Sequence, residues 1–152
     1  MLKLKKILFA EDDLNDVELT LRALEEYNIA NDIEVVHDGQ EALDYLYKKG
    51  KFTDRPNGNP VVIFLDIKMP KVDGLEVLKH IKSDPELKTI PVVILTSSNE
   101  EQDILRSYNL GVNAYVVKPV DFYRFSDAVE QVGVFWAILN EPPPNSVKKR
   151  QS

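Results

Sequence analysis

The feature that most constrains the fold is an uninterrupted apolar run, VVIFL at residues 61–65, that ends at Asp66. β-Branched and aromatic residues without a polar break are typical of a strand buried on both faces, as in a parallel sheet. Ligands of open α/β sheets bind at the carboxyl ends of such strands. Asp66 is therefore either a functional carboxylate or simply the start of a turn, for which Asp is also well suited. The run alone leaves both interpretations open.

Three further apolar runs have the same character, at residues 7–10, 92–95 and 114–117, and residues 33–36 are apolar except for Glu34 and are also predicted to be a strand. Segments with apolar residues at spacings of three and four, the pattern of one helix face, follow each run. Strand and helix thus alternate five times, which predicts a doubly wound parallel α/β sheet with right-handed crossovers and helices on both faces. All five strands then end at one edge of the sheet.

Three stretches need separate interpretation. Residues 49–60 are rich in Gly, Pro and Asn and are predicted to be a long loop. The last helix is expected to begin after Asp121, which can cap it, and to continue through Leu139. Residues 141–152 are Pro-rich and then basic, which predicts a disordered tail after a single domain at residues 1–140.

Composition excludes several classes of function. The chain has no cysteine, so disulfides and thiolate metal sites are excluded, and a reducing, cytoplasmic location fits. A formal net charge of −6 argues against nucleic acid as a direct partner. No apolar run approaches the length of a membrane span, so no membrane association is expected.

Polar residues with complementary chemistry follow four of the five strands. They are Glu11, Asp12 and Asp13 after the first, Asp66 after the third, Thr96 after the fourth and Lys118 after the fifth. Converging carboxylates repel one another, and hard oxygen ligands of this kind suit Mg²⁺, which takes few protein ligands. A carboxylate beside Mg²⁺, a lysine and a hydroxyl is equipped to accept a phosphoryl group. Polar residues scattered along a solvated edge would explain any one of these positions, but not all of them in order.

These stretches resemble the receiver domain of two-component response regulators. The matching segments are ILFAEDD (7–13), LDIKMP (65–70) with Asp73-Gly74, LTS (95–97) and YVVKP (115–119). The resemblance implies a flavodoxin-like (βα)5 fold with strand order 2-1-3-4-5. It also implies a signalling switch, phosphorylated by a sensor histidine kinase, that catalyses only its own aspartyl phosphorylation and dephosphorylation and is not otherwise an enzyme.

The same resemblance assigns the metal site. Asp66 would be the phospho-acceptor, and Asp12 and Asp66 would bind Mg²⁺ directly. The backbone carbonyl of Lys68 would be a further ligand, and Glu11 would act through water. The Lys68 side chain, two residues after the acceptor, is a local departure that brings a positive charge to the mouth of the site.

The resemblance also assigns the residues that respond to the phosphoryl group. Thr96 and Lys118 would bind the phosphoryl oxygens, with a cis Lys118–Pro119 bond directing the lysine toward Asp66. Tyr115 would be the switch aromatic that turns inward when Thr96 moves. Taken alone, Tyr115 is as well explained as a strand aromatic packed in the core; its position before Lys118-Pro119 favours the switch role.

Two other function classes share this topology. A Mg²⁺-dependent aspartyl phosphatase acting on small molecules needs a second acid two residues after its nucleophile, and that position holds Lys68. A flavodoxin-like cofactor binder needs a phosphate-cradling loop after the first strand, where Glu11, Asp12 and Asp13 would repel phosphate. The switch is therefore favoured over both.

The 49–60 loop, the TSSNEE stretch at 96–101 and the Phe135-Trp136 pair resemble the small stand-alone regulators that partner bacterial phytochromes. The last helix adds a reason to expect a protein partner, because it is apolar over more than one face. A terminal helix that packs deeply is the simpler alternative. We expect a homodimer through the fourth helix, fifth strand and fifth helix, with no attached output domain. The apolar stripe is Phe125, Val129, Val132, Trp136 and Leu139, with Phe122, Val134, Phe135 and Ile138 beside it.

Overall fold

The computed structural model describes residues 6–131 except 28, 30, 98–99 and 120. Its centre is a single parallel sheet, ordered β2-β1-β3-β4-β5. The order confirms the predicted doubly wound topology, with β1 at the point where the direction of winding reverses. The strands are β1 (Ile7–Ala10), β2 (Ile33–Val36), β3 (Val62–Leu65), β4 (Val92–Thr96) and β5 (Ala114–Val117).

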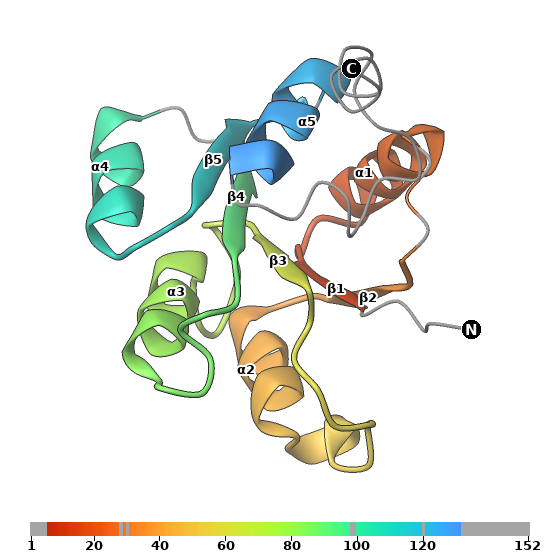
Figure 1. Cartoon of the computed structure of the whole chain (residues 1–152), viewed down its shortest axis with the longest axis vertical. Coiled ribbons are helices and arrows are strands. Elements are labelled where there is room, and N and C mark those ends of the chain that lie inside the picture. The colour runs from red at the N-terminus through yellow and green to blue at the C-terminus, as the bar shows by residue number, and fades with distance from the viewer. Residues whose placement is uncertain (1–5, 28, 30, 98–99, 120, 132–152) are drawn as a thin grey trace, which may run out of the picture.

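Five helices follow the strands in turn. In Figure 1, α1 and α5 lie on one face of the sheet, and α2 and α3 lie on the other, with α4 beside α3. None of the described helices is long and apolar enough to cross a membrane. The helices are α1 (Leu14–Glu26), α2 (Gly39–Tyr47), α3 (Gly74–Ser83), α4 (Glu101–Asn109) and α5 (Phe122–Gln131).

The last helix was predicted to reach Leu139, and the structure describes it as far as Gln131. Its apolar residues Phe125 and Val129 are fully buried, as the predicted stripe requires. The positions beyond them, including Val132, Val134, Phe135, Trp136, Ile138 and Leu139, lie outside the described residues, as does the tail at 141–152.

The alternation of side chains along each strand builds two separate cores. Leu8 and Ala10 of β1 pack with α2 and α3, whereas Ile7 and Phe9 pack with α1 and α5. All four are fully buried, which explains why the β1 sequence shows no polar alternation. Core packing therefore fixes the sheet from both sides and leaves only its edges for chemistry.

The segment at 49–60 is more ordered than the predicted loop. It contains a short 3₁₀ helix, η1 (Gly50–Phe52), and Phe52 is buried with its ring 5.1 Å from that of Tyr45. The Arg55 guanidinium lies 4.3 Å from the Tyr45 ring, and its Nε donates to the Tyr45 carbonyl at 2.6 Å. Gly and Pro correctly predicted the turns, but the aromatic and guanidinium anchors that order the segment come from contacts with α2.

Aspartate caps begin the helices that face the carboxyl edge of the sheet. Each cap carboxylate accepts a hydrogen bond from the backbone N–H three residues later, at 2.7–3.0 Å. The cap predicted at Asp121 also forms, because its carboxylate accepts from the Arg124 N–H at 2.9 Å. The capping residues are Asp13 for α1, Asp38 for α2 and Asp73 for α3.

Two glycines directly after these caps allow close backbone contact around the loop between β3 and α3. A Cβ on Gly74 would lie 2.0 Å from the carbonyl oxygen of Asp66, and one on Gly39 would lie 1.8 Å from that of Val72. The Gly74 N–H also donates to the Ile67 carbonyl at 2.7 Å. The loop that follows Asp66 is thereby held tightly between the starts of α2 and α3.

Candidate functional site

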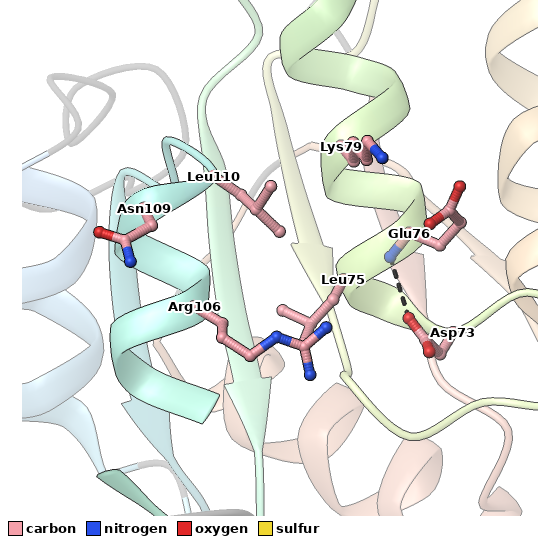
Figure 2. Close-up of a pocket in the computed structure, with 7 residues that line it drawn as sticks. All are labelled: Asp73, Leu75, Glu76, Lys79, Arg106, Asn109 and Leu110. Atoms are coloured by element: carbon pink, nitrogen blue, oxygen red, sulfur yellow. Dashed lines mark hydrogen bonds between the residues drawn. The ribbon is translucent and has the colours of Figure 1, made fainter. Parts of the chain in front are cut away.

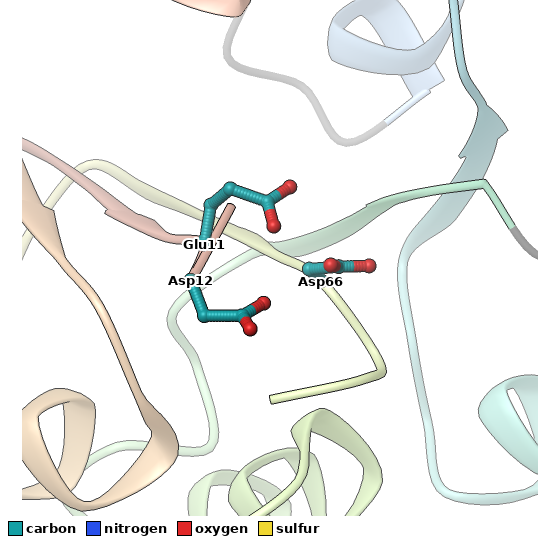
Figure 3. Close-up of side chains that lie close together, drawn as sticks. All are labelled: Glu11, Asp12 and Asp66. Carbon is teal, nitrogen blue, oxygen red and sulfur yellow. The ribbon is translucent and has the colours of Figure 1, made fainter. Parts of the chain in front are cut away.

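Three carboxylates meet at the carboxyl edge of the sheet. Ala10 of β1 pairs with Leu65 of β3, so the acids that directly follow these two residues emerge side by side. Oxygen atoms of Glu11, Asp12 and Asp66 all lie within 4.8 Å of one another. Figure 3 shows the three side chains projecting from the ends of β1 and β3 into one space. Glu11 and Asp66 are buried, whereas Asp12 is exposed.

Lys118, which follows β5, brings a cation into this cluster. Its ammonium donates a hydrogen bond to Glu11 Oε1, lies 3.1 Å from Asp16 Oδ2 and lies 4.0 Å from Asp66 Oδ2. Only 11% of the Lys118 side chain is exposed. The Lys118–Pro119 bond is cis, as expected from the resemblance. The lysine thus contacts carboxylates from three different segments of the chain.

Burial and charge perturb both members of the closest pair. Burial raises the pKa of Glu11 to about 7, with the Lys118 contact opposing the shift and the neighbouring Asp66 reinforcing it. Burial alone would lower the pKa of Lys118, but the hydrogen bond to Glu11 and the charge of Asp66 raise it above its usual value. Lys118 is therefore held as a cation, and Glu11 is the acid that titrates within the physiological range.

Asp66 is oriented by its own backbone. The Ile67 N–H donates to Asp66 Oδ1 at 2.9 Å, which leaves Oδ2 facing the Lys118 ammonium. The Asp66 N–H donates to the Ala10 carbonyl at 3.0 Å, continuing the pairing of β3 with β1. Only 10% of the Asp66 side chain is exposed.

The remaining predicted residues surround this cluster at different depths. Thr96 is the last residue of β4, not the first after it, and is buried; its carbonyl accepts from the Lys118 N–H at 2.8 Å. Tyr115 on β5 is partly buried and packs against the core on the α2 and α3 side. Lys68 lies in the loop between β3 and α3 with its side chain exposed. The roles assigned to these three residues stay predictions.

Sequence reasoning missed Asp16. It grouped Asp13 with the acids of the site, but the Asp13 carboxylate caps α1, and the acid that reaches Lys118 lies one helical turn beyond Asp12. The contact joins residues 102 positions apart. The only sequence signal was an acid in the first turn of a helix that begins at the carboxyl edge, which is also common at helix starts for reasons of capping and dipole.

A separate cleft of about 330 Å³ lies between α3 and α4 (Figure 2). Asp73 on its rim is occupied as the cap of α3, accepting from the Glu76 N–H at 2.9 Å. Lys79 and Arg106 add positive charges over an apolar floor that includes Leu75. Charges of both signs line the cleft, but among the described residues it lacks the buried lysine–carboxylate contacts found at the sheet edge. The acidic cluster is therefore the stronger candidate for the functional site.

The donor set of the acidic cluster fits a divalent cation. It offers only hard carboxylate oxygens, two of the three acids are buried, and the exposed third leaves an open side for water ligands. One positive charge, from Lys118, lies within 4.0 Å of two acids of the cluster, Glu11 and Asp66, and also of Asp16. A divalent ion would relieve the remaining repulsion, so the residues present could bind one.

The chain matches the response regulator receiver domain over residues 7–130. The structure of the bacteriophytochrome response regulator RtBRR is 57% identical, covers 97% of this chain and 89% of its own, and superposes with a TM-score of 0.82. Response regulator Rcp1 of Synechocystis sp. is 38% identical over 132 residues, 87% of this chain and 88% of Rcp1.

Two solved structures of such relatives bear on the chemistry. The Mn²⁺-bound form of Rcp1 is 37% identical, covers 91% of this chain and 97% of its own, and has a TM-score of 0.73. The phosphorylated cyanobacterial phytochrome response regulator RcpA is 41% identical, covers 88% of this chain and 94% of its own, and has the same TM-score, 0.73.

The fold, the residues of the site and the similar proteins all point to the same family. The strand order, the acids after β1 and β3 and the lysine after β5 coincide with a family match that spans most of the chain. Receiver domains are signalling switches that pair with sensor kinases, and are not enzymes in the usual sense. The chain belongs to the response regulator receiver domain family of two-component signalling.

Proposed function

We propose that this protein is a phosphorylation-dependent switch in which Asp66 accepts a phosphoryl group from a sensor histidine kinase. The observation that carries the proposal is the position of Asp66, largely buried, between the acidic cluster and the Lys118 ammonium. A carboxylate held there is oriented for attack on phosphorus, and the surrounding cations neutralise the charge that develops on the phosphoryl oxygens.

The chain's own residues divide the task. Asp66 Oδ2, which faces Lys118, is the attacking oxygen, because Oδ1 is held by the Ile67 N–H. The Lys118 ammonium binds one phosphoryl oxygen, and the Thr96 hydroxyl donates to another. The inward turn of Tyr115 then transmits the change to the surface formed by α4, β5 and α5.

Mg²⁺ is the cofactor we propose for this reaction. Asp12 and Asp66 would bind it directly, with the Lys68 carbonyl as a further ligand and Glu11 acting through water. Bound there, the ion supplies the charge that neutralises the phosphoryl oxygens. The acidic cluster and the Mn²⁺-bound form of Rcp1 support the choice of a divalent ion.

Acetyl phosphate with Mg²⁺ provides the direct test. Intact-mass spectrometry should show a gain of one phosphoryl group in the wild type and none in Asp66→Asn. Asp54→Asn, which changes an exposed aspartate outside the site, is the matched control and should be phosphorylated like the wild type. Phosphorylation of Asp66→Asn at the wild-type rate would assign the acceptor elsewhere.

The metal contribution can be separated from the acid repulsion with Asp12→Ala. We expect the variant to lose Mg²⁺ binding and, in EDTA, to be more stable than the wild type by about 1 kcal/mol, the size of one unit-charge contact in water. The reason is that one of three mutually repelling carboxylates is removed. Urea melts with EDTA and with Mg²⁺ measure both effects; a less stable Asp12→Ala in EDTA contradicts the repulsion argument.

The kinase is proposed to be of the phytochrome type and to act in the cytoplasm. RtBRR is a bacteriophytochrome response regulator and RcpA a cyanobacterial phytochrome response regulator, and both resemble this chain over most of its length. Co-purification of the kinase from the source organism, followed by phosphotransfer to wild type and Asp66→Asn, tests the pairing. We propose neither nucleic acid nor a membrane as a binding partner.

The output is proposed to be a homodimer formed through α4, β5 and α5 and strengthened by phosphorylation. Three large side chains on this surface are exposed: Leu105 and Tyr108 on α4 and Tyr123 on α5, at 54%, 50% and 80%. Sedimentation at micromolar concentration should show association that increases with beryllofluoride and is weakened in Leu105→Glu. A wild type that remains monomeric in both conditions contradicts the dimer and leaves the acceptor role of Asp66 intact.

A further inference from the structure

Asp16 belongs to neither the strand-end motifs nor the three-carboxylate cluster, yet it contacts the central lysine. Its Oδ2 lies 3.1 Å from the Lys118 ammonium. Asp13 caps the helix by accepting from the Asp16 N–H at 3.0 Å, so the backbone of Asp16 is fixed in the first turn of α1. The contact is therefore supported by the helix start and is not a chance encounter of two flexible side chains.

A phosphoryl group on Asp66 would compete with two carboxylates, Glu11 and Asp16, for the Lys118 ammonium. Its ammonium has three donor hydrogens and lies near three carboxylates, and the distance to Asp66 Oδ2, 4.0 Å, is too long for a hydrogen bond. A phosphoryl group on Asp66 presents oxygens that need one of those donors. Glu11 and Asp16 take two of the three donors, and both attract the ammonium, so a phosphoryl group that draws the ammonium toward Asp66 weakens one of these contacts.

Exposure identifies which contact is released. The Glu11 side chain is 1% exposed, whereas the Asp16 side chain is 37% exposed. A carboxylate left without its cation is much more costly when buried than when water can solvate it. Lys118 therefore keeps Glu11 and exchanges Asp16 for the phosphoryl oxygen.

We propose that Asp16 is a positioning residue that holds the Lys118 ammonium away from Asp66 until a phosphoryl group displaces it. It thereby sets how readily the site takes up a phosphoryl group. The inference rests on the proposed acceptor role of Asp66 and adds a competing carboxylate to that site.

The test measures binding of the phosphoryl mimic beryllofluoride at saturating Mg²⁺, by ¹⁹F NMR. Asp16→Asn should bind it about fivefold more tightly, the effect of losing one partly exposed charge pair in the resting state. Asp16→Glu keeps the charge on a longer side chain and should return the affinity toward the wild-type value. Glu18→Gln removes the same charge from α1 but faces Arg22, at 2.6 Å, and should bind like the wild type.

A double-mutant cycle separates direct contact from a general field effect. In a Lys118→Met background, Asp16→Asn should change beryllofluoride affinity little, because the ammonium for which it competes is gone. When Lys118 is present, the gain in beryllofluoride affinity caused by Asp16→Asn should also persist in high salt, which screens longer-range electrostatic interactions. A gain that survives Lys118→Met, or that disappears in high salt, overturns the inference.

The outcomes also distinguish this inference from the proposed function. If the wild type fails to bind beryllofluoride or to be phosphorylated on Asp66, the proposed function itself fails. If the wild type binds it and Asp16→Asn binds it no more tightly, only the positioning role of Asp16 is wrong.

Discussion

Lys118→Met is expected to lower the free energy of unfolding by about 3 kcal/mol near neutral pH, the usual cost of removing one partner from a buried ion pair. The ammonium is the cation that contacts Glu11 and Asp16 and faces Asp66. Methionine fills a similar volume, so the loss reports charge and hydrogen bonding more than packing. Urea melts in EDTA measure it, and saturating Mg²⁺ should restore part of the stability by supplying a replacement cation.

The stability cost of Lys118→Met should depend on pH, because Lys118 affects the pKa of Glu11. The folded protein retains the Glu11 proton up to about pH 7 because its pKa is raised from 4.5, so stability falls as pH rises from 4.5 through 7. Lys118 opposes that shift, and its removal should raise the pKa of Glu11 further. The penalty of Lys118→Met should therefore grow as pH rises through 7 and be smallest below pH 4.5, where Glu11 is mostly protonated in both the folded and the unfolded state. An equal penalty at both ends of this range contradicts the electrostatic explanation.

Gly74→Ala is expected to lower the free energy of unfolding by about 3 kcal/mol or more, as overpacking against rigid backbone does. The new Cβ would lie 2.0 Å from the Asp66 carbonyl oxygen and 2.8 Å from the Ile67 Cα. Neither atom is the end of a flexible side chain, so the loop after β3 must move. Because that movement displaces Asp66, phosphorylation by acetyl phosphate should be lost even in conditions where the variant is folded.

Gly58→Ala is the matched control for this substitution. A Cβ there meets nothing within 4 Å, and only its positive φ of 116° disfavours alanine. The control should lose about 1 kcal/mol and keep full phosphorylation. If Gly74→Ala resembles Gly58→Ala in both measurements, the close contact at Asp66 does not constrain the site.

The parallel sheet was predictable because its central strands are buried on both faces, whereas the strand order came from the resemblance to the receiver family. The strands β1, β3 and β4 are short apolar runs, fully buried, so their sequences show no alternation of apolar and polar residues. The convergence of Glu11, Asp12 and Asp66 followed from the parallel direction of β1 and β3, which are neighbours in the sheet.

Other features could not be read from local patterns. The contact of Asp16 with Lys118 depends on where the first turn of α1 lies relative to the residue after β5, across 102 residues of sequence. The Asp73-Gly74 pair contributed to the sequence-based prediction only as a matching segment, whereas the close contact of Gly74 with Asp66 depends on the path of a loop. In the 49–60 segment, Phe52 and Arg55 act through Tyr45 on another element. Each of these depends on tertiary placement, which spacing in the sequence does not record.

The anchored 49–60 segment has a practical consequence for spectroscopy. It precedes β3, whereas the acidic cluster follows it, so the two lie at opposite ends of one strand. Asp54 is exposed in this segment between the anchors Phe52 and Arg55, and the chain contains no cysteine. Asp54→Cys therefore creates a single thiol on an ordered support, where a fluorophore or spin label can follow the switching of the protein without touching its chemistry.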